Sequence, residues 1–208
     1  MINPEKTAFI CIHGYNVSDY RNSTGKISGV LAQRGFYAVD LVYHADNVIS
    51  ARKKNGDIAR RLNAMVKLLQ RGGYDNVVVC AHSNGNAALR LCYDLHQPWI
   101  DSVFCIQPAL PSEIHPYPTA KAHIFFNRKD NVVVMGKWLT LITKIVSKKW
   151  AAARNWGDMG NEGYNGPDDS VINIDVETKF GAHGHSGVFE DMAKVNHLVD
   201  YIIEQSHV

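Results

Sequence analysis

A single short stretch, Val79–Asn86 (VCAHSNGN), restricts the folds open to this chain more than any other part of it. The residues just before it, Val77 and Val78, extend an apolar, β-branched run that is typical of a buried strand. From Asn86 onward the apolar residues are spaced as on one face of a helix. The chain therefore passes from strand to helix without an ordinary loop. This predicts a strained backbone at Ser83 and requires very small neighbours.

The remainder of the chain alternates between strand-like and helix-like segments. Such alternation predicts an α/β fold, with a mostly parallel central sheet and helices on both faces. The expected strands are Thr7–His13, Tyr37–Tyr43, Val77–Ala81, Val103–Ile106, His123–Phe126 and Val171–Val176. The expected helices are Gly25–Arg34, Asp57–Arg71, Asn84–Leu95 and Val188–Glu204. We find no internal repeat and expect residues 1–208 to form a single domain.

Composition and charge narrow the class of partner. The 208 residues are 46% hydrophobic, which suffices for a full core, and the formal net charge of +2 comes from interspersed signs. This balance of charges does not indicate the basic patch that nucleic-acid binding requires, so we expect a small molecule or another protein as partner.

The sequence features that relate to cellular location favour a reducing environment. The opening residues, MINPEKTAFI, lack the apolar run of a signal peptide, and no uncharged apolar segment is long enough to span a bilayer. The four cysteines fall within expected strands or on a helix face, which favours buried thiols over a disulfide framework or a zinc site. We therefore expect a cytoplasmic protein.

Ser83 lies where a nucleophile is expected in a parallel sheet. Ligands bind at the carboxyl ends of the strands, and the following helix offers free backbone N–H groups at its positive end. A serine nucleophile needs a base, and the base needs an orienting carboxylate. Asp130 follows the strand His123–Phe126, and His185 lies in a glycine-rich loop after Val171–Val176. We predict Ser83 as nucleophile, His185 as base and Asp130 as orienting acid. The alternative is a serine that only caps a helix.

The first expected strand ends in a motif that suits the same site. A glycine after His13 lets the backbone pass close to the nucleophile. We predict that the backbone N–H groups of Tyr15 and Asn84 stabilise a developing oxyanion, and that Tyr15 also lines the substrate site. His13 is expected to be structural.

Four motifs together resemble those of the α/β-hydrolases: HGY (His13–Tyr15), AHSNG (Ala81–Gly85), RKDNVV (Arg128–Val133) and GHSGVF (Gly184–Phe189). AHSNG is similar to the G-x-S-x-G nucleophile elbow, with Ala81 replacing the first glycine, and the order Ser, Asp, His is that of the family. The stretch WGDMGNEGYNGPDD is similar to small lipase/esterase-like members, including phage-encoded ones. The resemblance covers nearly the whole chain. It implies a serine esterase, lipase or thioesterase that needs no cofactor and acts on a small-molecule ester.

The glycine-rich loop contains two histidines, and we prefer His185 as the base. His185 immediately precedes the last helical pattern, as the catalytic histidine does in the family that the chain resembles. His183 lies nearer the strand and is expected to hydrogen-bond within the loop.

Two other functions remain open. His183 and His185 lie two residues apart with Asp168, Asp169 and Asp175 nearby, so a metal-dependent hydrolase is one alternative. A third ligand at a recognisable spacing is missing, and we therefore expect no metal. The other alternative is a non-catalytic binding module on a hydrolase scaffold. No element of the predicted triad is missing, which argues against it.

Residues 131–170 interrupt the regular alternation and form an expected insertion. Long insertions in compact α/β domains are usually lids or binding loops. In the first part, apolar residues that include Trp138 recur at helical spacing, while the basic residues fall largely elsewhere. We predict that this insertion covers the active site and that Trp138 contacts an apolar acyl group. The alternative is an ordinary surface helix packed on the core.

Overall fold

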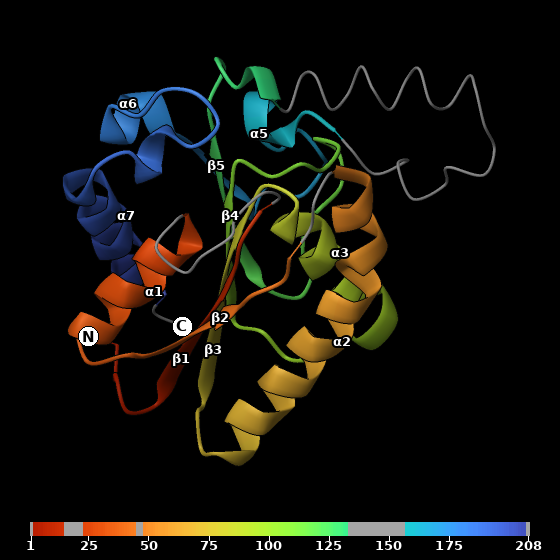
Figure 1. Ribbon diagram of the computed structural model, residues 1–208, viewed down its shortest axis with the longest axis vertical. Helices are drawn as coiled ribbons and strands as arrows, with labels where there is room; N and C mark the ends of the chain where they lie inside the picture. The colour runs from red at the N-terminus through yellow and green to blue at the C-terminus, as the bar shows by residue number, and fades with distance from the viewer. Residues whose placement is uncertain (1, 15–22, 45–47, 133–156, 207–208) are drawn as a thin grey trace.

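The computed structural model describes residues 2–14, 23–44, 48–132 and 157–206 (Figure 1). Six strands form one sheet in the order β2-β1-β3-β4-β5-β6, and every neighbouring pair is parallel. The strands are β1 (Thr7–Ile12), β2 (Tyr37–Leu41), β3 (Asn76–His82), β4 (Ser102–Ile106), β5 (Lys121–Phe126) and β6 (Ile172–Asp175). Because all six run the same way, the segments that follow them begin at one edge of the sheet.

Helices cover both faces of this sheet (Figure 1). One face carries α2 (Val48–Arg71) and α3 (Gly85–His96), and the other carries α1 (Thr24–Gln33) and α7 (Met192–Gln205). Three short segments complete the described helices: α5 (Met159–Glu162), α6 (Val176–Phe180) and the 3-10 turn η2 (Gly187–Phe189). The predicted α/β architecture, with a parallel sheet between two helical layers, is confirmed.

The sheet divides the core into two apolar layers, as strand β1 illustrates. Its side chains alternate, so that Ile10 and Ile12 belong to the layer under α2, whereas Phe9 and Cys11 belong to the layer under α1 and α7. All four side chains are buried. Burial on both faces explains why central strands of this chain are continuous apolar runs instead of alternating ones.

Helix α2 begins at Val48, well before the predicted start at Asp57. The pair Asn55-Gly56 resembles a turn in the sequence, yet it lies within the helix. Asn55 is buried, and its Oδ1 accepts a hydrogen bond from Asn84 Nδ2 at 2.9 Å. This tertiary contact outweighs the weak local preference for a turn.

Two aspartates set element boundaries that differ from the prediction. The carboxylate of Asp175 accepts the N–H of Glu177 at 2.9 Å, so β6 ends there and the unpredicted helix α6 begins. Asp191 accepts the N–H of Lys194 at 2.8 Å and caps α7, which starts at Met192. The predicted start at Val188 therefore falls in the turn η2.

The second part of the predicted insertion, residues 157–170, packs on the body of the fold. Met159 N donates to Leu110 O at 2.9 Å, and Asn127 N donates to Gly160 O at 2.8 Å. The segment that would contain Trp138 lies outside the described residues, so its role as a lid stays a prediction. The single-domain organisation predicted for residues 1–208 is likewise untested.

No helix in the described ranges has both the length and the apolar character needed to cross a membrane. The four cysteines are buried and free. The cytoplasmic location stays a prediction from the sequence.

The first residue of α3 packs against the end of β1 too closely for a side chain. A Cβ on Gly85 would lie 2.6 Å from Ile12 O and 2.9 Å from His13 O, both backbone atoms. We expect Gly85→Ala to lower the free energy of unfolding by about 1–3 kcal/mol in urea denaturation, because the backbone must move. Gly56→Ala in α2 is the control. Its Cβ meets nothing within 4 Å, so it should stabilise the helix by about 0.5–1 kcal/mol. Wild-type stability in Gly85→Ala would contradict this packing.

Candidate active site

Ser83 occupies a sharp turn between the end of β3 and the start of α3. Its φ of +51° lies in the left-handed region, which a residue with a side chain seldom adopts. Backbone bonds hold the turn: Ser83 N donates to Ile106 O at 3.0 Å, and Ser83 O accepts from Ala109 N at 3.2 Å. Gly14 permits the turn, since a Cβ there would lie 2.8 Å from the Cβ of Ser83. The predicted strained turn is present, with its hydroxyl at the carboxyl edge of the sheet.

Ser83, His185 and Asp130 form one hydrogen-bonded line. His185 Nε2 lies 2.8 Å from Ser83 Oγ, and His185 Nδ1 lies 2.7 Å from Asp130 Oδ2. A carboxylate only accepts, so Nδ1 carries the proton and the bare Nε2 accepts from the serine hydroxyl. The structure thus brings together the three residues that the sequence singled out, although they lie far apart in the chain.

Burial decreases along this line from the acid to the imidazole. Asp130 is 0% exposed, whereas the side chain of His185 is 13% exposed. The carboxylate also receives the backbone N–H of Val132 at 3.2 Å, and Asp130 N donates to Asn127 O at 2.9 Å. A buried, well-bonded carboxylate is suited to orient an imidazole and to stabilise its charged form.

No protein-family model and no curated protein sequence matches the chain. Solved structures do resemble it. The lipase BlEst2 of Bacillus licheniformis in its mature form has a TM-score of 0.58 at 12% identity, covering 99% of this chain and 94% of the lipase. A structure from the work on the metagenome-derived lipolytic enzymes LipS and LipT has a TM-score of 0.56 at 11% identity, covering 97% of this chain and 94% of that one.

A third structure extends the likeness. MGS-MChE2, an α/β-hydrolase enzyme from the sediment metagenome of the Mar Chica lagoon in Morocco, has a TM-score of 0.53 at 14% identity, covering 96% of this chain and 91% of that one. The chain has the α/β-hydrolase fold. In this hydrolase fold, Ser83 stands at the elbow that the sequence motif predicts.

Asn84, the predicted oxyanion donor, lies at the N-cap of α3, where backbone N–H groups have no partner within the helix. Its buried side chain is anchored away from Ser83: Nδ2 donates to Tyr43 Oη at 3.1 Å and to Asn55 Oδ1 at 2.9 Å. The second predicted donor, Tyr15, lies outside the described residues, so its role in the hydrolase fold stays a prediction.

His13 sits beside the elbow without reaching it. Its Nε2 accepts the backbone N–H of Tyr43 at 3.0 Å, so Nδ1 carries the proton and donates to Gly14 O at 2.6 Å. Burial lowers the pKa of His13, and its ring stacks on Tyr43 with centroids 4.2 Å apart. Both nitrogens are occupied by backbone groups, which suits the structural role that we predicted.

His82 is the second buried histidine at the elbow. Its Nε2 lies 3.1 Å from His185 O, a group that only accepts, so Nε2 is protonated. The bare Nδ1 accepts the hydroxyl proton of Ser23 at 2.8 Å. Burial, reinforced by the neighbouring His185, lowers the pKa of His82 to about 3. The ring is therefore neutral near pH 7.

The two loop histidines have different surroundings. His183 is exposed, and its Nδ1 lies 3.4 Å from Glu177 Oε1 in α6. We expected it to bond within its own loop, and the structure instead places it against the preceding helix. His185 directs its ring nitrogens to Ser83 and Asp130.

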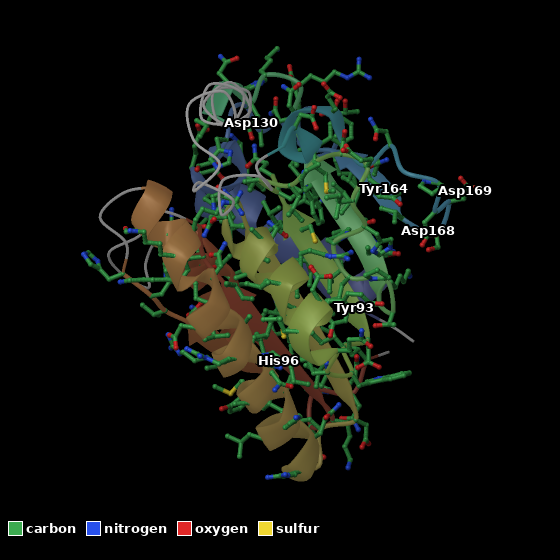
Figure 2. All side chains as sticks on the ribbon, turned by 90° about the vertical axis from the view of Figure 1, so that its right-hand side faces the viewer. Tyr93, His96, Asp130, Tyr164, Asp168 and Asp169 are labelled. Carbon is green, nitrogen blue, oxygen red and sulfur yellow. The ribbon has the colours of Figure 1, made fainter. Side chains whose placement is uncertain are left out.

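The acidic residues considered as metal ligands are likewise dispersed. Asp168 Oδ2 lies 3.5 Å from His115 Nε2, and Asp175 caps α6. Asp168 and Asp169 are well separated from Asp130 (Figure 2). Within the described parts of the chain, no three potential ligands gather as a metal site would require. The geometry does not favour the metal-dependent alternative.

Two polar residues near Ser83, His185 and Asp130 were not predicted from the sequence. Gln107 directly follows β4, and Asn127 directly follows β5. Both are 0% exposed, and their side-chain amides reach the loop of His185. In the sequence, each could have been recognised as a polar residue that immediately follows an apolar strand.

The neutral state of His82 links stability to pH. An unfolded imidazole has a pKa near 6.5, so below that pH the unfolded chain binds a proton that folded His82 resists. Stability is therefore lost as the pH falls from 7 toward 3. Between pH 7 and 5, His82 alone should account for about 2 kcal/mol of this loss. Urea denaturation of His82→Gln should show a loss smaller by that amount. An equal loss of unfolding free energy in the wild type and in His82→Gln would contradict the neutral state of His82.

Proposed function

We propose that this chain is a serine hydrolase that cleaves carboxylic esters or thioesters through an acyl-enzyme on Ser83. The observation that carries the proposal is the line of two hydrogen bonds, 2.8 and 2.7 Å long, from Ser83 through His185 to the buried Asp130. A serine, a suitably protonated imidazole and an orienting carboxylate are the parts that nucleophilic acyl transfer requires. This geometry supports the triad roles that we propose.

In the acylation step, Ser83 Oγ attacks the carbonyl carbon of the substrate while His185 Nε2 takes the hydroxyl proton. The imidazolium that forms is stabilised by Asp130. The tetrahedral intermediate then expels the alcohol or thiol, which receives the proton from His185, and the acyl group stays on Ser83. Water repeats the sequence with His185 as base and releases the carboxylic acid. Every step is proton transfer or acyl transfer, so no cofactor is needed.

The developing negative charge needs hydrogen-bond donors at the elbow. The backbone N–H of Asn84 directly follows Ser83 and lies at the positive end of α3, a position that supports such a role. We assign it as one oxyanion donor, with the N–H of Tyr15 as the other on the basis of the HGY motif.

An ester substrate is favoured by two lines of support. A serine nucleophile suits acyl transfer, and two of the similar structures are described as a lipase and as lipolytic enzymes. We therefore propose a small-molecule ester with an apolar acyl group, in keeping with the apolar face predicted around Trp138.

The test is hydrolysis of p-nitrophenyl acetate and butyrate by purified variants. Ser83→Ala and His185→Ala should each lower kcat by about 10³-fold or more, and the double variant should lose little beyond either single one, because the residues act as a unit. Asp130→Asn should also lower kcat strongly, since it favours the wrong tautomer of His185.

The matched control is His183→Ala, which removes the neighbouring exposed histidine and should retain near-wild-type kcat. Near-normal hydrolysis by Ser83→Ala would contradict the proposal. Loss of wild-type activity in EDTA would favour the metal-dependent alternative. A wild-type protein that hydrolyses no ester but binds one would favour the binding module.

A further inference from the structure

Three buried side chains donate hydrogen bonds to backbone carbonyls in the loop that carries His185. The shared feature is a side-chain N–H aimed at a loop carbonyl oxygen: Asn127 Nδ2 to Ala182 O at 2.8 Å, Gln107 Nε2 to Gly184 O, and His82 Nε2 to His185 O at 3.1 Å. We call His82, Gln107 and Asn127 the loop clamp.

The three residues of the loop clamp lie at the ends of three neighbouring strands. His82 is the last residue of β3, Gln107 follows β4, and Asn127 follows β5. Their exposures are 4%, 0% and 0%. Buried hydrogen bonds between such groups are costly to leave unmade, so each donor holds its carbonyl firmly. The rigid edge of the sheet thereby sets the position of a loop that belongs to the far end of the chain.

Each donor residue is held by a second contact, which the side chain makes in His82 and Asn127 and the backbone makes in Gln107. His82 accepts the hydroxyl proton of Ser23 at its other nitrogen, and its ring lies 5.0 Å from the ring of Phe189 between centroids. The Oδ1 of Asn127 accepts the N–H of Lys129 at 2.8 Å. Gln107 is held by its backbone N–H, which donates to Phe125 O at 2.7 Å. Because these donors are themselves fixed, their hydrogen bonds determine where the carbonyl groups of the loop lie.

The His185 loop needs such support because its own backbone is permissive. Gly181 and Gly184 have φ values of +61° and +70°, a region that glycine enters and leaves without steric cost. The reaction, in contrast, requires His185 Nε2 within hydrogen-bond reach of Ser83 Oγ. A displacement of about 1 Å in a catalytic group can cost about 10²-fold in rate.

We propose that His82, Gln107 and Asn127 are positioning residues that fix the loop of His185 so that its imidazole meets Ser83 and Asp130. The expected effect on kcat rests on the proposed function, whereas the expected effect on the position of the His185 loop rests on the hydrogen bonds alone. His82 does not act as a base: both of its nitrogens are engaged, by Ser23 and by the carbonyl of His185.

The test uses variants that remove a donor while conserving size, together with one variant of His82 that keeps a donor. His82→Phe keeps a ring and removes both polar nitrogens, whereas His82→Gln keeps a neutral donor of similar reach. Gln107→Met keeps the chain length and removes the amide. His183→Ala, in the same loop but outside the clamp, is the control. Measurements are kcat and KM for p-nitrophenyl butyrate, thermal unfolding, and the downfield proton resonance of His185 Nδ1–H in its bond to Asp130.

We expect His82→Phe and Gln107→Met to lower kcat by about 10- to 100-fold with KM within about threefold of wild type, since ground-state binding is untouched. His82→Gln should recover most of kcat. The His185 resonance should shift or broaden in His82→Phe and Gln107→Met, and it should persist in His82→Gln and His183→Ala.

A folded His82→Phe or Gln107→Met with wild-type kcat and an unchanged resonance would overturn the clamp, even if Ser83→Ala abolishes hydrolysis and the proposed function stands. Equal kcat losses in His82→Phe and His82→Gln would also overturn the hydrogen-bonding role of His82. If the protein hydrolyses no ester, the proposed function fails, and the resonance still decides the clamp. Gln107→Met supplies the same decision if His82→Phe does not fold.

Discussion

The turn at Ser83 is the constraint on which the rest of the site depends. A serine at φ +51° between a buried strand and a helix persists only where the surrounding structure holds it, and here the end of β1 packs closely against the turn. Gly14 and Gly85 make room for that approach, since a Cβ on either would collide with Ser83 or with Ile12 O. The strained turn presents the hydroxyl at the sheet edge and directs the start of α3 toward it. The same tight turn therefore strains the backbone of Ser83 and positions its hydroxyl.

The parallel sheet supplies the remaining geometry. The ends of β3, β5 and β6 open toward the same edge, so Ser83, Asp130 and His185 meet although the chain separates them widely. The sheet edge also fixes the neutral histidines His13 and His82, whose pKa values are lowered by burial. Of these imidazoles, His185 alone is shared between a carboxylate and a hydroxyl in the described residues, which gives it a distinct chemical role.

The parts of the structure that depend on local pattern could be predicted from the sequence. The strands and the order of Ser83, Asp130 and His185 followed from apolar runs and from the residues placed after them. The start of α2 could not, because a contact with distant Asn84 keeps Asn55 in the helix. Gln107 was missed for a similar reason. Its amide has no signature of a nucleophile, acid or base, and its partner at Gly184 is set only by the tertiary fold.

We propose that Ser83 is a nucleophile activated by its neighbours. The most direct measurement is reaction of the intact protein with a fluorophosphonate, followed by mass spectrometry of the peptides. We predict a single adduct on Ser83 that is absent from Ser83→Ala and forms far more slowly in His185→Ala. An adduct on another residue, or equal labelling of the wild type and Ser83→Ala, would contradict it.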